Sequence, residues 1–362
     1  MRKHYLDNIR WITVLLVVFY HVIYFYSAVV QEFSVGSFRQ VQIQDGFLYL
    51  VYPWFMILLF LVSGICSRYY LQRHSVKAFV GSRSRKLLVP STIGLLAFQW
   101  ILGYFSMSIN GAFEVMPVDT IPKPVIFCIM ALSGIGPLWY IQALWVFSML
   151  LALIRKCEKK GKLYTLCGKA NFPVCLALTI PVWGAAQILN TPVITVYRMG
   201  VYGLSFLLGY FVFSQEQVLE RLSHYWQVLL GSALIIGIVY TVHYFGEEFY
   251  TEPIISNPFS MAYAWIMVLA ILASMHRFGN WDNSFTRRMN RWSFGIYVFH
   301  YLGLSVAAWA IGWPQALPAW LSYPLLGLAS LGGSILLFEL ISRIPVIRFC
   351  VLGMKKEKKN VR

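Results

Sequence analysis

Ten long apolar runs constrain the fold of this chain more than any other feature of its sequence. A run of about 20 apolar residues can cross the hydrocarbon core of a bilayer as a helix. Charged residues make up only 12% of the 362 residues, roughly half of their usual fraction in a soluble domain. So few charges cannot cover a water-exposed surface, and lipid must cover much of the outside. The runs lie near residues 9–30, 45–67, 87–109, 125–154, 173–190, 198–214, 225–245, 259–275, 292–312 and 319–342.

The runs predict an all-α integral membrane protein, a bundle of about ten transmembrane helices, because helices satisfy their own backbone groups in lipid. The fourth run is too long for one straight span, so a piece around Pro124 to Gly136 is expected to be re-entrant or interfacial. The first run is too long for a signal peptide and no clear cleavage site follows it, so we expect it to be an uncleaved first transmembrane helix. No linker or repeat divides the chain; we expect a membrane domain at residues 1–344 and a basic cytoplasmic tail at residues 345–362.

The basic residues collect in alternate segments between the runs. They lie at the start of the chain up to Arg10, after the second, fourth, sixth and eighth runs, and at the C-terminus, which places 27 of 30 on one face. Only Arg39, Lys123 and Arg198 fall on the other face. The positive-inside rule makes the basic face cytoplasmic, so both termini are expected in the cytoplasm of a cell-membrane protein. The net charge of +16 is explained by this placement, and no nucleic-acid partner is expected.

Polar side chains within the apolar runs are the main candidates for function. A charge at the centre of a transmembrane helix costs about 2.5–3.5 kcal/mol on insertion scales, so a polar residue that persists there needs a reason. The candidates within the runs are His21, Gln99, Gln142, Gln187, His300 and Glu339.

The first run carries the most informative pair of these polar residues. Arg10 and His21 are eleven residues apart, which puts them within about 20° on one helix face and about 16.5 Å apart along the axis. Asp7, three residues before Arg10, can pair with it on that face. The pattern predicts a track from the cytoplasmic entrance to the membrane interior. It is also compatible with a snorkelling arginine and a structurally hydrogen-bonded histidine.

The basic string Arg83-Ser84-Arg85-Lys86 runs directly into an apolar segment that contains Pro90. We expect Pro90 to kink or restart the chain at the membrane surface. Cations at that position suit the phosphates of a ligand such as coenzyme A. They also suit an anchor against anionic lipid, and the string alone leaves both interpretations open.

Two further stretches join aromatic and polar residues. Trp139 and Tyr140 lie at the entrance of a span, with Gln142 close behind, and their rings can stack on a sugar or belong to the interfacial belt. Residues 293–300 end on His300, which can contact substrate or be a satisfied core histidine. Nucleotide-binding loops, zinc-protease motifs and metal-type cysteine spacings are absent from the sequence, and we expect no metal.

The order of these elements resembles the acyltransferase family 3 membrane proteins. The segment YLDNIR at residues 5–10 with His21 is similar to the family signature of a basic residue, ten positions and a histidine. The segment FLVSG at residues 60–64 is similar to its F-x-x-S-G element. Arg83 to Lys86 resembles its R-x-x-R motif, but lysine replaces the second arginine; it keeps the charge and loses the bidentate fork.

The stretches 138–140 and 293–300 also match the family in style and order, so the resemblance covers nearly the whole chain. It implies a ten-helix bundle that moves an acyl group, usually acetyl, from cytoplasmic acyl-CoA to an extracytoplasmic glycan. Residue by residue, it implies catalysis by His21, support of the donor side by Arg10, and binding of the coenzyme A phosphates by Arg83 with Lys86.

We therefore expect a multi-pass membrane O-acyltransferase that transfers an acyl group, acetyl first of all, to a hydroxyl of a saccharide or small molecule. His21 is the expected general base, and Trp139, Tyr140, Gln142 and His300 are the expected substrate contacts. The alternative is a transporter or exporter of a cell-envelope saccharide or precursor, since polar residues near the midplane fit both classes. The sequence leaves open the acceptor, a longer acyl group, a covalent acyl-histidine, a separate extracytoplasmic partner and the oligomeric state.

Overall fold

The computed structural model describes residues 3–30, 38, 40–158, 161–191, 196–311 and 317–355, and in these residues the regular structure is helical. The prediction of an all-α protein is confirmed. Within the described residues, eight helices are long and apolar enough to cross a membrane, judged by length and composition. They are His4–Tyr24, Ile43–Leu71, Val76–Ile109, Leu138–Cys157, Trp226–Tyr244, Pro258–Phe278, Ser284–Ile311 and Ala319–Arg343.

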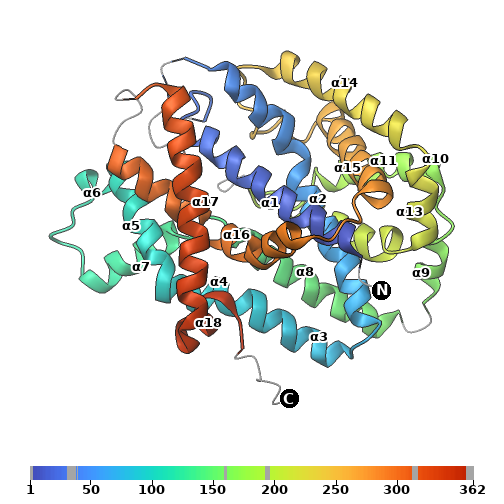
Figure 1. Ribbon diagram of the computed structural model, residues 1–362, viewed down its shortest axis with the longest axis horizontal. Helices are drawn as coiled ribbons and strands as arrows, with labels where there is room; N and C mark the ends of the chain where they lie inside the picture. The colour runs from blue at the N-terminus through green and yellow to red at the C-terminus, as the bar shows by residue number, and fades with distance from the viewer. Residues whose placement is uncertain are drawn as a thin grey trace. The chain divides into compact units, whose positions relative to one another are not determined.

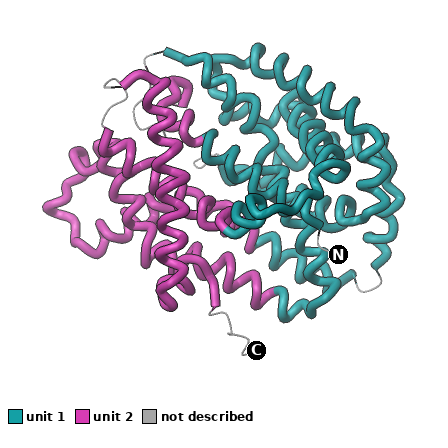
Figure 2. Tube along the Cα trace, in the orientation of Figure 1, with its two compact units in different colours: residues 1–20, 40–79, 146–291 teal, residues 21–39, 80–145, 292–362 magenta. Residues whose placement is uncertain are grey.

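The chain forms two compact units, drawn in different colours in Figure 2, and each is described separately. Unit 1 contains Met1–Tyr20, Gln40–Phe79 and Val146–Arg291; unit 2 contains His21–Arg39, Val80–Trp145 and Trp292–Arg362. Four of the helices labelled in Figure 1 contribute residues to both units, because the boundary falls inside them: α1 (His4–Tyr24), α3 (Val76–Arg83), α8 (Leu138–Cys157) and α16 (Ser284–Ile311).

The other elements each belong to one unit. Unit 1 has η1 (Ile43–Asp45), α2 (Gly46–Leu71), α9 (Lys162–Cys167), α10 (Phe172–Ala177), α11 (Thr179–Ala185), α12 (Met199–Leu208), η4 (Gly209–Phe213), α13 (Glu216–Ser223), α14 (Trp226–Tyr244) and α15 (Pro258–Phe278). Unit 2 has η2 (Ser84–Leu88), α4 (Val89–Gly94), η3 (Leu95–Gln99), α5 (Trp100–Ile109), α6 (Ala112–Val115), α7 (Lys123–Ser133), α17 (Ala319–Arg343) and α18 (Pro345–Leu352).

Helix α2 is the packing centre of unit 1, where it contacts α12, η4, α14 and α15. Glycines set the closest approach, because a Cβ at Gly64 would overlap the carbonyl oxygen of Phe206, and a Cβ at Gly209 that of Leu61. Lipid gives little hydrophobic drive for helices to associate, so small residues that let backbones touch are the usual basis of such crossings. Both contacts involve the F-x-x-S-G segment, through Gly64 in one and Leu61 in the other.

In unit 2 the last turn of α1 packs against α16 and α17. Val22 and Phe25 form a buried cluster with Leu304, Ala308 and Leu326. The cluster fixes the end of α1 that carries His21 against the helix that carries His300.

The fourth apolar run is divided in the structure, as its length requires. Helix α7 ends at Ser133, and α8 begins at Leu138. The connection needs Gly136, whose φ of 39° lies in the left-handed region that favours glycine. The re-entrant or interfacial placement of α7 stays a prediction.

Three other runs differ in detail from the sequence expectations. The helix in the first run ends at Tyr24 rather than near residue 30. The fifth and sixth runs form shorter apolar helices, Phe172–Ala185 and Met199–Phe213.

Pro90 does not restart the chain: the helical segment continues from Val76 to Ile109, and the π-helical turn η2 precedes the proline. A π turn changes the local hydrogen-bond register, which accommodates a residue that has no backbone N–H.

We predict that Gly64→Ala lowers the stability of unit 1, because the added methyl group meets a backbone carbonyl that cannot rotate away. Overpacking of this kind costs about 1–3 kcal/mol of the free energy of unfolding. The matched control is Gly231→Ala in α14, where a Cβ meets nothing within 4 Å. Thermal unfolding of the purified variants in detergent measures both. Equal melting temperatures for the two variants would contradict the close crossing.

Candidate functional site

Two histidines that lie 279 residues apart in the sequence meet in unit 2. Nδ1 of His21 in α1 is 3.2 Å from Nε2 of His300 in α16, and the ring centroids are 5.1 Å apart. His300 is fully buried, whereas His21 is half-buried. The structure therefore brings together the expected catalytic residue and one of the expected substrate contacts.

Tyrosine rings surround this histidine pair. The rings of Tyr24 and Tyr301 stand edge-on to His21, with centroids 5.8 and 5.2 Å away. The ring of Tyr297 lies 6.0 Å from that of His300. These rings enclose the pair in an aromatic cluster, and the two contacts with His21 have the edge-to-face geometry that aromatic pairs favour.

Tyr297 connects the pair to the start of α8. Its hydroxyl donates a 2.6 Å hydrogen bond to the carbonyl oxygen of Pro137, and its ring lies 5.4 Å from that of Tyr140. Trp139 contacts the Tyr140 ring at 6.4 Å and is half-buried. Tyr140 is thus one ring away from His300, so this expected substrate contact lies in the same aromatic cluster.

Gln142 lies on α8 with a different partner. Its side-chain amide donates to the carbonyl oxygen of Ser91 in α4, at 3.2 Å. This bond holds α8 against the helical segment that follows the basic string. The structure gives Gln142 a role in joining the two elements; its expected substrate contact stays a prediction.

The other expected catalytic residue of α1, Arg10, lies in unit 1. Its guanidinium is 3.6 Å from the carboxylate of Asp7 and donates to the sulfur of Cys66 at 3.1 Å. The predicted pairing of Asp7 with Arg10 is confirmed. The side chain of Arg10 is 41% exposed, so the protein does not enclose its guanidinium.

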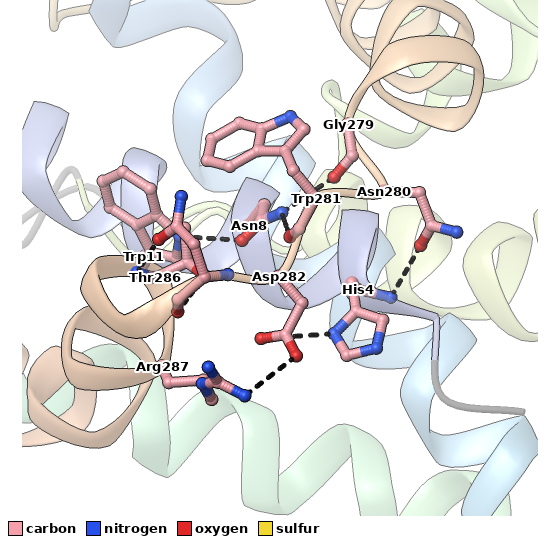
Figure 3. Close-up of polar contacts among 10 residues, drawn as sticks. His4, Asn8, Trp11, Gly279, Asn280, Trp281, Asp282, Thr286 and Arg287 are labelled. Carbon is pink, nitrogen blue, oxygen red and sulfur yellow. Dashed lines mark hydrogen bonds and ion pairs between the residues drawn. The ribbon is translucent and has the colours of Figure 1, made fainter.

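Asn8, between these two charged residues, anchors the start of α1 to the loop that joins α15 and α16 (Figure 3). It is 1% exposed, and its amide nitrogen donates to the carbonyl oxygens of Gly279 at 2.7 Å and Trp281 at 2.8 Å. Its amide oxygen accepts from the indole N–H of Trp11 at 3.0 Å. One side chain therefore satisfies three polar groups that lipid would leave without partners.

The same loop caps the first turn of α16 (Figure 3). The Asn283 side chain accepts from the backbone N–H of Thr286 at 2.9 Å, and the Thr286 hydroxyl accepts from the backbone N–H of Asn283 at 3.0 Å. Asp282 lies 3.5 Å from Arg287 and 3.9 Å from His4. These contacts fix the residue at which α16 begins, and His300 lies farther along the same helix.

A charged tether links the residues before α1 to α13 and α15. The Lys3 ammonium lies 2.7 Å from the Glu216 carboxylate, and the His276 ring lies 3.1 Å from it. Partial burial raises the pKa of Glu216, but the hydrogen bonds from Lys3 and His276 outweigh it and hold that pKa below its ordinary value. The carboxylate form is thus stabilised at this junction.

The basic string belongs to the end of α3 and the π turn η2. Arg83 is half-buried, and Lys86 is exposed. The Ser84 hydroxyl accepts from the indole N–H of Trp145 at 3.1 Å, which ties the turn to α8. Gly353, just after α18, approaches the carbonyl oxygen of Arg85 so closely that a Cβ would overlap it. The described part of the C-terminal segment therefore packs directly on the basic string.

The remaining polar candidates have varied surroundings. Glu339 accepts from the indole N–H of Trp292 at 2.9 Å, and Gln187 donates to the carbonyl oxygen of Ser256 at 2.7 Å. Gln99 is 2% exposed, and both atoms of its amide lack a partner in the part of the chain that the structure describes. No group of three His, Cys, Asp or Glu side chains in those residues could hold a metal ion.

Sequence reasoning missed Asn8, Tyr297 and Tyr301 as parts of these sites. Asn8 belongs to the segment YLDNIR at residues 5–10, and Tyr297 belongs to the stretch 293–300. A sequence motif does not show which of its side chains contact another helix. Tyr301 follows His300 directly and gave no signal of its own.

The helices and the buried polar residues define an all-helical, multi-pass membrane protein with a histidine pair between helices. Within that class, the chain belongs to acyltransferase family 3: the family model described as an acyltransferase domain matches residues 3–339, nearly the whole chain. No curated protein and no solved structure matches the chain.

We predict that Asn8→Ala destabilises the protein by about 1–3 kcal/mol, because the buried carbonyl oxygen of Gly279 and the partly buried one of Trp281 lose their donor. The control is Asn280→Ala. The Asn280 side chain accepts an exposed 3.0 Å hydrogen bond from the backbone N–H of His4, so its loss is expected to stay within about 0.5 kcal/mol. Thermal unfolding in detergent gives the comparison. A loss for Asn8→Ala no larger than for Asn280→Ala would remove the anchoring role.

Proposed function

We propose that this protein is a membrane O-acyltransferase that moves an acyl group, acetyl first of all, from cytoplasmic acyl-CoA to a hydroxyl of an extracytoplasmic saccharide or small molecule. The observation that supports it best is the contact of His21 with His300 inside a protein of this family. A polar pair kept at an internal helix contact of a membrane protein is costly without a function.

His21 is the general base of the proposed reaction. A hydroxyl is a poor nucleophile at neutral pH because it holds its proton tightly. A neutral imidazole beside it can take the proton as the oxygen attacks the thioester carbonyl, and such a base contributes about 10²–10⁴-fold to the rate.

Arg10, Arg83 and Lys86 hold the donor in this proposal. The partial exposure of Arg10 and the exposure of Lys86 leave these charges accessible to an anionic ligand. Coenzyme A carries a pyrophosphate and a 3′-phosphate, which arginine and lysine bind through charge-assisted hydrogen bonds. Trp139, Tyr140 and Gln142 contact the acceptor, since aromatic rings stack on the apolar faces of sugars.

In the proposed topology two of the three shorter apolar helices among the described residues, Phe172–Ala185 and Met199–Phe213, also cross the membrane, whereas the third, Lys123–Ser133, does not. Together with the eight longer helices they make ten spans. An even number of spans leaves both termini on one side, and the basic residues make that side the cytoplasm. The proposal includes the domain division at residue 344 and a location in the cell membrane.

We predict that His21→Ala and His21→Gln both abolish acyl transfer and leave acyl-CoA binding nearly intact. Glutamine keeps hydrogen bonds but cannot act as a base, so it separates catalysis from packing. The measurement is transfer of labelled acetyl from acetyl-CoA to a hydroxyl acceptor by purified protein, with donor binding and thermal unfolding measured in parallel. Near-normal turnover in the glutamine variant would exclude His21 as the base. Labelled acetyl trapped on His21 itself would instead make it a covalent carrier.

We predict that Arg83→Ala combined with Lys86→Ala weakens donor binding, since each charge-assisted contact contributes about 1.5–3 kcal/mol. The apparent affinity is expected to fall by tens to thousands of fold. If these residues hold the 3′-phosphate, the loss is larger for coenzyme A than for its analogue without that group. The control is Lys77→Ala, which removes an exposed positive charge of the same cytoplasmic segment. If the correctly inserted double variant binds the donor with unchanged affinity, the basic string does not bind coenzyme A and is instead an anchor against anionic lipid.

A further inference from the structure

His300 has a well-defined hydrogen-bonding environment. Its Nδ1 lies 2.8 Å from the carbonyl oxygen of Tyr297 and 3.2 Å from that of Ile296, and its Nε2 lies 3.2 Å from Nδ1 of His21. The side chain is fully buried at 0% exposure. Its backbone carbonyl accepts from the Ser330 hydroxyl at 3.0 Å, which joins α16 to α17 at this residue.

These contacts determine which nitrogen of His300 carries the proton. A carbonyl oxygen can only accept, so the Nδ1 that faces two carbonyl oxygens is the N–H donor. Full burial holds the ring neutral, because an uncompensated charge is costly there. A neutral imidazole has one proton, so Nε2 of His300 is an acceptor with a lone pair.

The position of the proton on His300 determines the position of the proton on His21, because the two rings are in contact at 3.2 Å. Because Nε2 of His300 accepts, Nδ1 of His21 has to be the donor. The neutral His21 ring then carries its proton on Nδ1 and its lone pair on Nε2. The lone pair is thereby placed on the nitrogen that points away from His300.

We infer that His300 is a positioning residue that fixes the tautomer and orientation of His21, so that Nε2 of His21 is the basic atom. This inference rests on the proposed function for the identity of the reaction. It gives His300 a role through His21, in place of the direct substrate contact that its sequence suggested.

The proton and the electron pairs balance in this arrangement. Nε2 of His21 takes the proton of the acceptor hydroxyl while the oxygen forms a bond to the thioester carbonyl carbon. The carbon–sulfur bond then breaks, and the departing thiolate of coenzyme A takes the proton back from Nε2, which restores the neutral ring. Throughout, Nδ1–H of His21 donates to His300, which stabilises the imidazolium without accepting a second proton.

The test compares His300→Gln with His300→Leu. The side-chain carbonyl of glutamine can accept from Nδ1–H of His21, whereas leucine fills the space and cannot accept. We expect His300→Leu to lower kcat by about 10²-fold or more, the scale of a positioned base, with the KM for acyl-CoA unchanged. We expect His300→Gln to keep kcat within about tenfold of the wild type, since only one neutral hydrogen bond changes its acceptor.

A second readout reports the tautomer itself and does not require turnover. Protein labelled with ¹⁵N-histidine is reconstituted in bilayers, and the His21 signals among the seven histidines are assigned by their loss in His21→Gln. We expect the His21 proton on Nδ1 in the wild type and in His300→Gln. In His300→Leu we expect a mixture of both tautomers.

Several results would overturn the inference. One is a wild-type His21 that carries its proton on Nε2. Others are a normal kcat in His300→Leu, or a lowered kcat with an unchanged His21 tautomer, which would leave His300 with a packing role only. Loss of kcat in His300→Gln equal to that in His300→Leu would also overturn it. Absence of acyl transfer by the wild type would instead reject the proposed function, and the tautomer measurement would still decide the role of His300.

Discussion

Lipid offers no hydrogen-bond partner, and this constraint governs the polar residues of the whole structure. Every buried donor or acceptor has to find its partner within the protein or bear the cost of lacking one. Asn8 meets this requirement with three hydrogen bonds, and His300 meets it with the carbonyl oxygens of its own helix and with His21. The positions of α1 and α16 follow from these few directional contacts as much as from apolar packing.

Helix α1 joins the two chemical parts of the proposed reaction. Its first turns carry Arg10, half-exposed and paired with Asp7, and its last turn carries His21 at the histidine pair. A continuous helix is a stiff connection, so the two residues keep their spacing along it. The Asn8 anchor at one end and the cluster around Phe25 at the other hold this helix in its unit at each end.

In the histidine pair, a contact between two helices determines the tautomer of the proposed base. A histidine that bonds to the carbonyl oxygens one turn earlier in its own helix has its tautomer fixed locally. Its second nitrogen then imposes the tautomer of any histidine that it meets. No charged residue is needed for this effect, which suits an interior where a buried carboxylate would be costly.

The sequence by itself determined the class of fold and the residues of the family motifs, whereas the sidedness that the basic residues indicate stays a prediction. The fold class and the motifs follow from amino-acid composition and from the spacing of residues along one helix. The pairing of Asp7 with Arg10 could therefore be predicted from their three-residue interval. Only the tertiary structure decided that His21 meets His300, that Asn8 holds the loop at residues 279–281, and that the π turn η2 accommodates Pro90. A periodic pattern gives the face of one helix but not the rotation of its neighbour. That rotation depends on where glycines such as Gly64 let backbones touch and on which polar groups find partners across the contact.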